Sequence, residues 1–476
     1  MNALWTAADA LEATHGVTSC DWAATGVSID TRTLQPGDLF VALKDLRDGH
    51  DFVKLALEKG AAAAMVTHRP ADVGPDAPLL VVPDVLKGLE ALGQAARARS
   101  KTRIIAITGS VGKTSTKEML RTVLSRQGKC HAAEASYNNH WGVPLTLARM
   151  SADADYAVIE IGMSNPGEIA PLSQLTRPHV AMVTTVAAAH LAQFDSLDGI
   201  AAEKATIVDG LEPGGIAVLN GDIATSGLLQ DRARAADAQI VLFGETTGDW
   251  RISDLRICQD VTVIAAGSPG HDYLFKLSVP GRHFALNAVG VLAVVAALGA
   301  DPVAASLDLA LWVPPAGRGT REIIQLDQAS EFETLDLMDD AFNANPTSLA
   351  ASLEVIAAGQ PRDGVGRVAK GRRIAVLGDM LELGPDEVAM HQAMAQNPHL
   401  QQIDLVHCAG PLMRHLWQAL PENQRGQWMP TAADLAARAA RLVDAGDVVL
   451  VKGSKGSKIA LVVDAIRKLG HRRPYA

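Results

Sequence analysis

Short apolar runs alternate with segments of helical periodicity along most of this chain. Residues 103–107, 156–162 and 180–186 are rich in Ile, Val and Ala, a pattern typical of strands buried on both faces of a parallel sheet. Residues 117–124 and 199–205 instead carry the Ala, Leu, Met, Glu and Lys typical of helices. This alternation predicts the α/β class, with doubly wound sheets in more than one part of the chain.

The chain of 476 residues is too long for one ordinary core, so we expect several domains. Turn residues and changes in pattern predict three units, at 1–99, 100–314 and 315–476. The stretch Pro-Pro-Ala-Gly-Arg-Gly at 314–319 marks the second boundary. Strands are predicted at 26–29, 39–43 and 61–66 in the first unit, and at 334–338, 373–377, 405–408 and 447–451 in the third.

A glycine loop follows the apolar run at 103–107 and precedes a helical pattern. It reads Thr-Gly-Ser-Val-Gly-Lys-Thr-Ser over 108–115. Backbone N–H groups in such a loop approach phosphate oxygens, and the helix N-terminus adds partial positive charge. Lys113 could then reach the β- and γ-phosphates and Thr114 could bind Mg²⁺. The longer P-loop pattern would place a glycine where Ile107 stands, so the loop is a shortened version.

Glu160 lies inside the predicted strand at 156–162, near its carboxyl end, and His190 closely follows the predicted strand at 180–186. Ligands bind open α/β sheets at the carboxyl ends of the strands, so these side chains can converge with Lys113. Taken singly, each of the two is more often structural. Lys204 lies on the predicted helix at 199–205, and composition alone favours a surface lysine there. Asn287, near the start of an apolar helix, could bind an adenine edge or cap a bend.

The third unit contains two polar loops at strand ends. The first reads Asp-Asp-Ala-Phe-Asn-Ala-Asn-Pro-Thr-Ser over 339–348. We expect a helix capped near Thr347 or Ser348, which leaves Asp340, Asn343 and Asn345 for ligand binding. The second loop, Lys-Gly-Ser-Lys-Gly-Ser-Lys over 452–458, could hold a carboxylate at a helix start or could simply be solvated.

Composition narrows the class of protein further. The formal net charge of −10 argues against a nucleic-acid or membrane-surface partner. The four cysteines are far apart, which indicates neither a disulfide framework nor a zinc site. No basic and apolar leader is visible at the start, and the apolar stretch 284–300 is interrupted by Asn287 and Gly290. We therefore expect a cytoplasmic protein without membrane insertion.

With these motifs in place, the chain resembles the Mur ligases of peptidoglycan synthesis over nearly its full length. The loop G-S-V-G-K-T-S matches the family's shortened phosphate loop, and G-I-A-A-E-K-A, I-E-I-G-M-S-N-P-G-E-I and N-N-H-W-G-V-P-L resemble its central domain. D-T-R and D-G-H-D-F resemble its N-terminal domain. D-D-A-F-N-A-N-P-T-S and V-L-G-D-M-L-E-L-G resemble the C-terminal domain of the D-alanyl-D-alanine branch, and no D-N-P-R or D-D-P-R string of the diamino-acid branch occurs.

The resemblance implies a role for each candidate residue. Residues 1–99 would bind the UDP substrate, 100–314 ATP, and 315–476, Rossmann-like, the incoming dipeptide. Lys113, His190 and Lys204 would be catalytic, and Lys204 matches the family's carbamylated lysine. Mg²⁺ would be held by Thr114, Glu160, His190 and Lys204. ATP would be bound by Gly109, Ser110, Val111, Gly112, Lys113, Thr114, Ser115, Asn287, Arg318, Asp340, Asn343 and Asn345. The other substrates would be bound by Asp30, Thr31, Arg32, Asn138, Asn139, His140, Trp141, Lys452 and Ser454.

The activity that the resemblance implies is an ATP-dependent peptide ligation in a monomer. D-Alanyl-D-alanine would be joined to UDP-N-acetylmuramoyl tripeptide through an acyl phosphate. Two alternatives stay open at this point. Another amide ligase of the superfamily, such as a folylpolyglutamate synthase, would use other substrates, and an ATP-binding switch would not ligate at all. Asp30, Thr31 and Arg32 could also be ordinary surface-turn residues.

Overall fold

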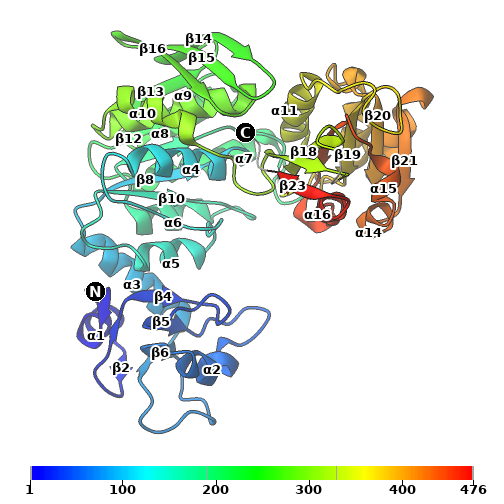
Figure 1. The fold of residues 1–476 in the computed structure, drawn as a ribbon. Helices are drawn as coiled ribbons and strands as arrows, with labels where there is room; N and C mark the ends of the chain where they lie inside the picture. The colour runs from blue at the N-terminus through cyan, green and yellow to red at the C-terminus, as the bar shows by residue number, and fades with distance from the viewer. Residues whose placement is uncertain (1–2, 190, 328–329, 474–476) are drawn as a thin grey trace.

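The chain folds into three lobes that follow one another in sequence (Figure 1). The computed structural model describes residues 3–189, 191–327 and 330–473. Each lobe is built on its own main sheet, and these sheets lie within residues 17–81, 103–277 and 320–473. The predicted α/β class is confirmed. The three predicted units each contain one of the main sheets, while their exact boundaries stay predictions.

The N-terminal lobe has a five-stranded sheet in the order β2-β7-β6-β5-β4, and β1 pairs with β3 beside it. The strands β4 to β7 run parallel to one another, and β2 pairs with β7 in the antiparallel direction. The elements are β1 (Trp5–Thr6), α1 (Ala7–Thr14), β2 (Val17–Thr18), β3 (Ala23–Ala24), β4 (Gly26–Ser28), β5 (Asp38–Val41), η1 (Gly49–Phe52), α2 (Val53–Glu58), β6 (Ala63–Val66), β7 (Leu79–Val81) and α3 (Val85–Arg99).

The central lobe has a nine-stranded sheet in the order β16-β15-β14-β13-β12-β11-β8-β10-β9. The strands from β9 to β14 run parallel, and β14 to β16 form an antiparallel extension. Its strands are β8 (Arg103–Thr108), β9 (Cys130–Ala132), β10 (Tyr156–Glu160), β11 (Val180–Val183), β12 (Ile216–Asn220), β13 (Gln239–Gly244), β14 (Trp250–Ile257), β15 (Thr262–Ser268) and β16 (His271–Leu277). Its helices are α4 (Lys113–Leu124), α5 (Gly142–Ala148), α6 (Ile169–Thr176), α7 (Leu197–Ala205), η2 (Thr206–Gly210), α8 (Ser226–Ala235), α9 (Arg282–Ala297), α10 (Pro302–Asp308) and η3 (Leu309–Leu311).

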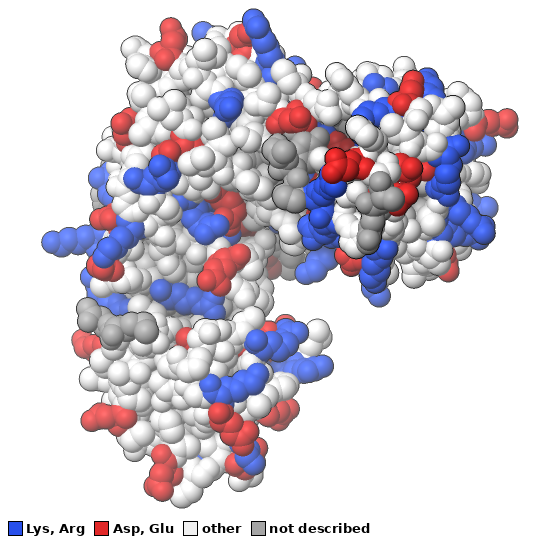
Figure 2. All heavy atoms as spheres, viewed as in Figure 1, with Lys and Arg blue, Asp and Glu red and all other residues white. Residues whose placement is uncertain are grey.

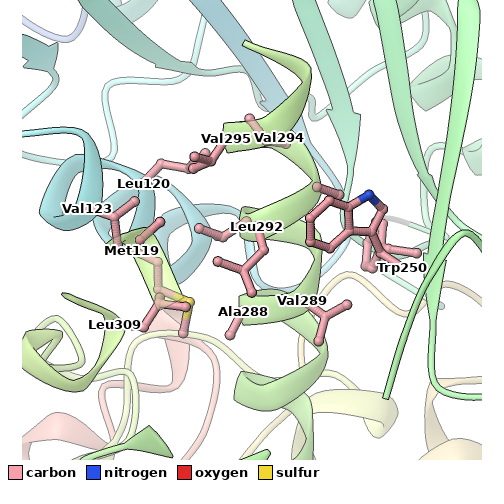
Figure 3. Close-up of a cluster of buried hydrophobic side chains, with 14 of the residues drawn as sticks. Met119, Leu120, Val123, Trp250, Ala288, Val289, Leu292, Val294, Val295 and Leu309 are labelled. Carbon is pink, nitrogen blue, oxygen red and sulfur yellow. The ribbon is translucent and has the colours of Figure 1, made fainter. Parts of the chain in front are cut away.

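Alternate residues of β8 belong to two different cores, because strand side chains point to opposite faces. Ile105 and Ile107 pack with α4, α9 and α10, whereas Ile104 and Ala106 pack with α5 to α8. Figure 3 shows the first core, where the apolar side of α9 meets α4 and Trp250. Burial of each Val or Leu in such a core stabilises the fold by about 1.5–3 kcal/mol. These two cores fix the sheet edge from which the glycine loop projects.

The C-terminal lobe has a seven-stranded sheet in the order β21-β20-β19-β22-β18-β17-β23, parallel from β21 to β18. Helices cover both faces, as expected for a doubly wound sheet. Its strands are β17 (Thr320–Gln325), β18 (Thr334–Asp340), β19 (Arg373–Gly378), β20 (Leu405–Ala409), β21 (Arg425–Met429), β22 (Val448–Lys452) and β23 (His471–Arg473). Its helices are α11 (Pro346–Ala357), α12 (Glu387–Ala393), η4 (Met394–Gln396), η5 (Leu400–Gln402), α13 (Met413–Ala419), η6 (Glu422–Gln424), α14 (Ala432–Ala436), α15 (Ala439–Leu442), η7 (Lys455–Ser457) and α16 (Ala460–Arg467).

The lobes are joined in two different ways. The N-terminal lobe shares a hydrophobic core with α5 of the central lobe, and the indole N–H of Trp5 donates to Ala148 O at 2.8 Å. The C-terminal lobe follows a linker in which Gly317 and Gly319 have φ of +72° and +89°, a backbone conformation that favours glycine. Figure 2 shows that the surface is hollowed between the N-terminal and C-terminal lobes. Within the described ranges, none of the helices has the length and apolar character needed to cross a bilayer.

Candidate active site

The glycine loop lies between the carboxyl end of β8 and the start of α4. Gly109 and Gly112 have φ of +153° and +89°, so both need the freedom of glycine. The hydroxyl of Ser110 donates to Ala187 O at 3.0 Å and fixes the loop against the segment after β11. β8 lies between β10 and β11, which makes this a topological switch point where open α/β sheets bind ligands. The predicted strand–loop–helix unit is confirmed, although α4 begins at Lys113 rather than at residue 117.

Thr114 and Glu160 meet directly beneath this loop. The Thr114 hydroxyl lies 2.9 Å and 3.1 Å from the two carboxylate oxygens of Glu160. Asn138 donates its side-chain amide to Glu160 Oε1 at 2.7 Å. Glu160 is only 1% exposed, and these two donors satisfy a carboxylate whose burial would otherwise be costly. Two neighbouring oxygen-bearing side chains are the donor type that Mg²⁺ prefers.

The side chain of Lys113 folds back onto the glycine loop, and its ammonium donates to Gly109 O at 2.6 Å. Desolvation lowers the pKa of Lys113, the nearby Glu160 carboxylate opposes this shift, and Arg318 reinforces it. The two cations therefore share one enclosed region that faces Glu160. An anion entering this region would be attracted by both of them.

A cavity of about 340 Å³ brings the glycine loop together with side chains from the linker and the C-terminal lobe. Eleven of the twelve predicted ATP-binding residues line it, and the exception is Gly109. The predicted residues that line it are Ser110, Val111, Gly112, Lys113, Thr114, Ser115, Asn287, Arg318, Asp340, Asn343 and Asn345, together with Glu160, Asn138, Asn139 and Lys452. We call this space the nucleotide cavity.

Arg318 connects the linker to both neighbouring lobes. Its guanidinium carbon lies 4.0 Å from the centre of the Phe342 ring, a cation–π distance. Its Nη2 donates to Ser136 Oγ of the central lobe at 3.3 Å. Desolvation lowers the pKa of Arg318, while the Glu160 and Asp340 carboxylates favour its charged form. The guanidinium stays protonated and adds a fixed positive charge to the nucleotide cavity.

Lys204 is buried within the central lobe at 1% exposure, so the surface-lysine alternative is wrong. It does not line the nucleotide cavity itself. Desolvation lowers its pKa well below the ordinary value, and the positive charge of Lys113 acts in the same direction. Burial therefore favours the neutral amine of Lys204. His190, predicted beside it, lies outside the described residues.

The predicted start of the first helix in the C-terminal lobe needs correction. The helix α11 is capped by Asn345, whose Oδ1 accepts the N–H of Ser348 at 2.8 Å while Ser348 Oγ accepts the N–H of Asn345 at 3.0 Å. The predicted cap at Thr347 or Ser348 is therefore wrong, because Pro346 takes the first helical position and moves the cap one residue before it. Asn345 thus has a structural task that the sequence analysis did not give it.

Lys452 and Ser454, expected in an anion-binding loop, are both buried. The Lys452 ammonium donates to Asp340 Oδ2 at 2.6 Å and to Asn343 O at 3.0 Å. The Ser454 hydroxyl donates to Ala344 O at 3.2 Å and accepts the N–H of Leu381 at 2.9 Å. Their side chains therefore join neighbouring strand ends of the C-terminal sheet.

A second, larger cleft of about 1110 Å³ lies where the N-terminal lobe meets the central lobe. Asp30, Thr31, Arg32, His140 and Trp141 all line it. Asp30 accepts the backbone N–H of Arg32 and pairs with its guanidinium at 2.6 Å, which lowers the pKa of Asp30. The three residues therefore form a polar turn and also face the cleft. We call this space the substrate cleft.

Several lining residues were not predicted. Ser136, His283, Phe342 and Ser352 line the nucleotide cavity, and Tyr137 and His50 line the substrate cleft. Burial lowers the pKa of His283 to about 4, so its imidazole is neutral near pH 7. Phe342 and His50 lie inside stretches already noted for other residues, and Ser136, Tyr137 and His283 lie within two residues of such stretches, whereas Ser352 lies near none. Their positions in the sequence did not indicate that their side chains would face either space.

The sequence matches three family domains that together span most of the chain. These are the "Mur ligase family, catalytic domain" over residues 23–100, the "Mur ligase middle domain" over 107–295 and the "Mur ligase, glutamate ligase domain" over 327–455. The UDP-N-acetylmuramoyl-tripeptide–D-alanyl-D-alanine ligase of Escherichia coli is 35% identical over 93% of this chain and 94% of its own length. The ligase of the same name from Bacillus subtilis is 33% identical over 92% of each chain.

Solved structures of ligases with the same family name also match this chain. MurF from Acinetobacter baumannii superposes with a TM-score of 0.82 at 27% identity, covering 97% of this chain and 99% of its own. The MurF ligase from Thermotoga maritima in complex with ADP has a TM-score of 0.75 at 25% identity, covering 93% and 97%. A folylpolyglutamate synthase from Mycobacterium tuberculosis, at 19% identity and a TM-score of 0.60, shares the fold.

Proposed function

This chain belongs to the Mur ligase family, and we propose that it is the member that completes the muramoyl pentapeptide. It joins D-alanyl-D-alanine to UDP-N-acetylmuramoyl tripeptide, and the conversion of ATP to ADP and phosphate drives the reaction. The observation that carries this proposal is the 35% identity to a ligase of that specificity over 94% of the relative's length. The cavity formed by three parts of the chain supplies a place for the chemistry.

ATP binds in the nucleotide cavity. We assign its phosphates to the backbone N–H groups of the glycine loop and to Lys113, because both present positive charge at the start of α4. Asn287 lies against the loop, with its amide 3.0 Å from the position that a Cβ on Gly112 would take. We assign Asn287, Asp340, Asn343 and Asn345 to the remaining part of the nucleotide.

We further propose that Mg²⁺ binds between Thr114 and Glu160. The two side chains are already in contact, and Mg²⁺ needs only one or two carboxylates when phosphates and waters complete its octahedron. Among the described residues no group of three His, Cys, Asp or Glu could hold a metal without such help. When bound, the ion would neutralise phosphate charge during transfer. His190 stays a predicted ligand.

The buried amine of Lys204 supports its assignment as a carbamylated lysine. A neutral amine reacts with CO₂ to give an anionic carbamate and one proton, so the lysine side chain becomes an oxygen ligand. Within the described part of the chain, Lys204 Nζ makes no hydrogen bond or ion pair, and only the nearby Glu203 carboxylate favours its charged form. The negative charge of the carbamate would be stabilised by the nearby Lys113 and by the proposed metal ion.

The reaction proceeds in two steps. The γ-phosphoryl group of ATP passes to the terminal carboxylate of the tripeptide, which forms an acyl phosphate and ADP. The amine of D-alanyl-D-alanine then attacks the acyl carbon and inorganic phosphate leaves. Both reactants of the first step are anions, so Lys113 and Arg318 lower its barrier by opposing their repulsion. Enclosure by the C-terminal lobe keeps water from the acyl phosphate.

The UDP end of the substrate belongs in the substrate cleft, and its peptide end reaches toward the nucleotide cavity. Polar groups at the cleft, including Asp30, Arg32 and His140, suit a nucleotide sugar. The dipeptide would enter from the C-terminal lobe near Lys452 and Ser454. A cytoplasmic location and a monomeric state stay predictions.

Phosphate release measured with defined substrates tests this function. With ATP, Mg²⁺ and UDP-N-acetylmuramoyl tripeptide, we expect phosphate to accumulate rapidly only when D-alanyl-D-alanine is added. L-Alanyl-L-alanine, single amino acids and glutamate serve as matched controls and should leave the rate near background. Equal rates with and without the dipeptide would indicate an ATPase or switch, and stimulation by glutamate would indicate a different ligase.

A further inference from the structure

Residues 133–141, between β9 and α5, form a wall that the nucleotide cavity and the substrate cleft share. We call them the wall segment. Its side chains divide between the two spaces. Ser136, Asn138 and Asn139 line the nucleotide cavity, whereas Tyr137, His140 and Trp141 line the substrate cleft. A displacement of this short segment on one side must therefore change the shape of the other side.

Lys117 holds the beginning of the wall segment. Its side chain is completely buried, and its ammonium donates to Ala133 O at 2.5 Å and to Ala135 O at 3.4 Å. Glu118 Oε1, 2.8 Å away, balances the charge. A buried ammonium needs hydrogen-bond acceptors and a negative charge close to it. Lys117 therefore holds the two carbonyl groups at a fixed distance and direction from α4. In the sequence alone, Lys117 is only one residue of a helical pattern.

The position of Lys117 on α4 connects this anchor to the phosphate site. The same helix begins with Lys113 and Thr114, and Lys117 lies one turn later on it. Helical residues three or four apart lie on the same side, so Lys117 follows any adjustment of the phosphate-binding end. One rigid helix thus carries the predicted nucleotide contacts and the hold on the wall segment.

Further contacts keep the wall segment from moving independently. Ser136 Oγ lies 3.4 Å from Thr114 Oγ1, and Asn138 binds Glu160 through its side chain and Gly162 N–H through its carbonyl. At the other end, a Cβ on Gly142 would lie 2.6 Å from the Tyr137 carbonyl carbon. That distance is too short for any residue but glycine. The wall segment is therefore held at Thr114 and Glu160, the proposed Mg²⁺ site, and also at the start of α5.

We propose that Lys117 is a positioning residue that couples nucleotide binding to binding of the UDP-linked substrate. It does so by fixing the wall segment to the phosphate-binding helix. The proposal rests on the proposed function, which places the UDP-linked substrate in the substrate cleft. Coupling of this kind is reciprocal, so each ligand tightens the binding of the other by the same factor.

Calorimetric binding of UDP-N-acetylmuramoyl tripeptide, with and without Mg²⁺ and β,γ-methylene-ATP, measures the coupling factor. We expect at least about fivefold tighter binding with the analogue in the unaltered protein, the lower end of ordinary coupling. Lys117→Met keeps the length of the side chain but removes its donors, and should reduce the factor to below about twofold. Lys117→Arg, which keeps a cationic donor, should restore part of it. Lys129→Met, at an exposed lysine paired with Asp153, is the matched control and should keep the full factor.

Two results would overturn the proposal: a folded Lys117→Met protein with an unchanged coupling factor, or no coupling in the unaltered protein. If circular dichroism shows that Lys117→Met does not fold, hydrogen exchange of the unaltered protein decides. The analogue alone should then slow exchange at residues 140–142, on the cleft side, and an unchanged rate there refutes the coupling. Phosphate release by the unaltered protein is measured in parallel. Its failure would refute the ligase, whereas normal release with unchanged coupling refutes only the role of Lys117.

Discussion

Gly112 is the residue on which the shape of the phosphate loop most directly depends. Its φ of +89° disfavours any side chain, and a Cβ there would lie 3.0 Å from both polar atoms of the Asn287 amide. The backbone conformation and the contact with Asn287 therefore each exclude a side chain at this position. The sequence showed the glycine but not the amide that packs against it.

Gly112→Ala should therefore impair nucleotide binding far more than stability. We expect the KM for ATP to rise at least tenfold, equivalent to about 1.4 kcal/mol of lost binding, within the cost of a strained non-glycine residue. Steady-state phosphate release at varied ATP measures this. Gly227→Ala, in α8 with no atom near the added Cβ, is the control and should leave the KM unchanged. An unchanged KM in Gly112→Ala would show that the loop tolerates a side chain.

Glu160 and Lys204 show that two equally buried ionisable residues can differ in their hydrogen-bond partners and in the protonation state that burial favours. Both are 1% exposed, yet Glu160 has two hydrogen-bond donors while the burial of Lys204 favours its neutral form. The sequence identified Glu160 correctly as a carboxylate within a buried strand, because an apolar run surrounds it. It did not reveal the burial of Lys204, since the helix around that residue is short and its polar and apolar positions are mixed.

At the scale of elements, strand ends were easier to predict than strand partners. β8, β10, β18, β19, β20 and β22 were all anticipated within a few residues, because each is a short apolar run followed by polar or glycine residues. No strand was predicted between 211 and 280, where β12 to β16 lie. The extension from β14 to β16 has one exposed face, so its apolar residues alternate with polar ones and no continuous apolar run marks it.

The cap of α11 leads to a prediction at this scale. Asn345→Ala removes both the cap and an amide that lines the nucleotide cavity, whereas Asn345→Ser keeps a capping oxygen. We expect the alanine variant to lose about 1 kcal/mol of unfolding free energy and the serine variant to lose much less. Urea unfolding followed by circular dichroism measures the difference.

The KM for ATP separates the two tasks of Asn345. If the amide contacts the nucleotide, both variants should raise the KM, although only alanine lowers stability. Equal stability of the two variants would contradict the capping role. A KM unchanged in the serine variant would contradict the nucleotide contact.

At the scale of the whole molecule, the two interfaces between lobes differ in kind. The N-terminal and central lobes share buried apolar side chains, including Leu145 and Ala148 of α5. Between the central and C-terminal lobes, the described residues make hydrogen bonds and ion pairs instead. Arg282 pairs with Glu245 of its own lobe and, at 3.2 Å, with Glu354 on α11, and the Ala192 N–H lies 3.4 Å from Glu382 O. Polar interfaces of this type permit domain motion, so we expect the C-terminal lobe to move about the linker.

Loss of the Arg282–Glu354 pair should shift that motion toward an open arrangement. We expect Glu354→Gln to increase the radius of gyration in small-angle scattering without nucleotide, and ATP to reverse the increase. Unfolding free energy should change by less than about 1 kcal/mol, because the Arg282 side chain is nearly half exposed. Asp231→Asn, which weakens an exposed ion pair within α8, is the control and should leave the scattering unchanged. An unaltered radius in Glu354→Gln would show that other contacts hold the lobes.

The sequence by itself determined the α/β class, the shortened phosphate loop and the residue types needed for ATP-driven ligation. These features are local, because a strand, a glycine turn and a helix start depend on neighbours in the chain. Only the tertiary structure decided that Arg318, Asp340 and the glycine loop line one cavity, that Asn345 caps a helix and that Lys117 holds the wall segment. Such contacts join residues far apart in sequence or on different elements, and they are set by how the sheets and lobes pack rather than by any local pattern.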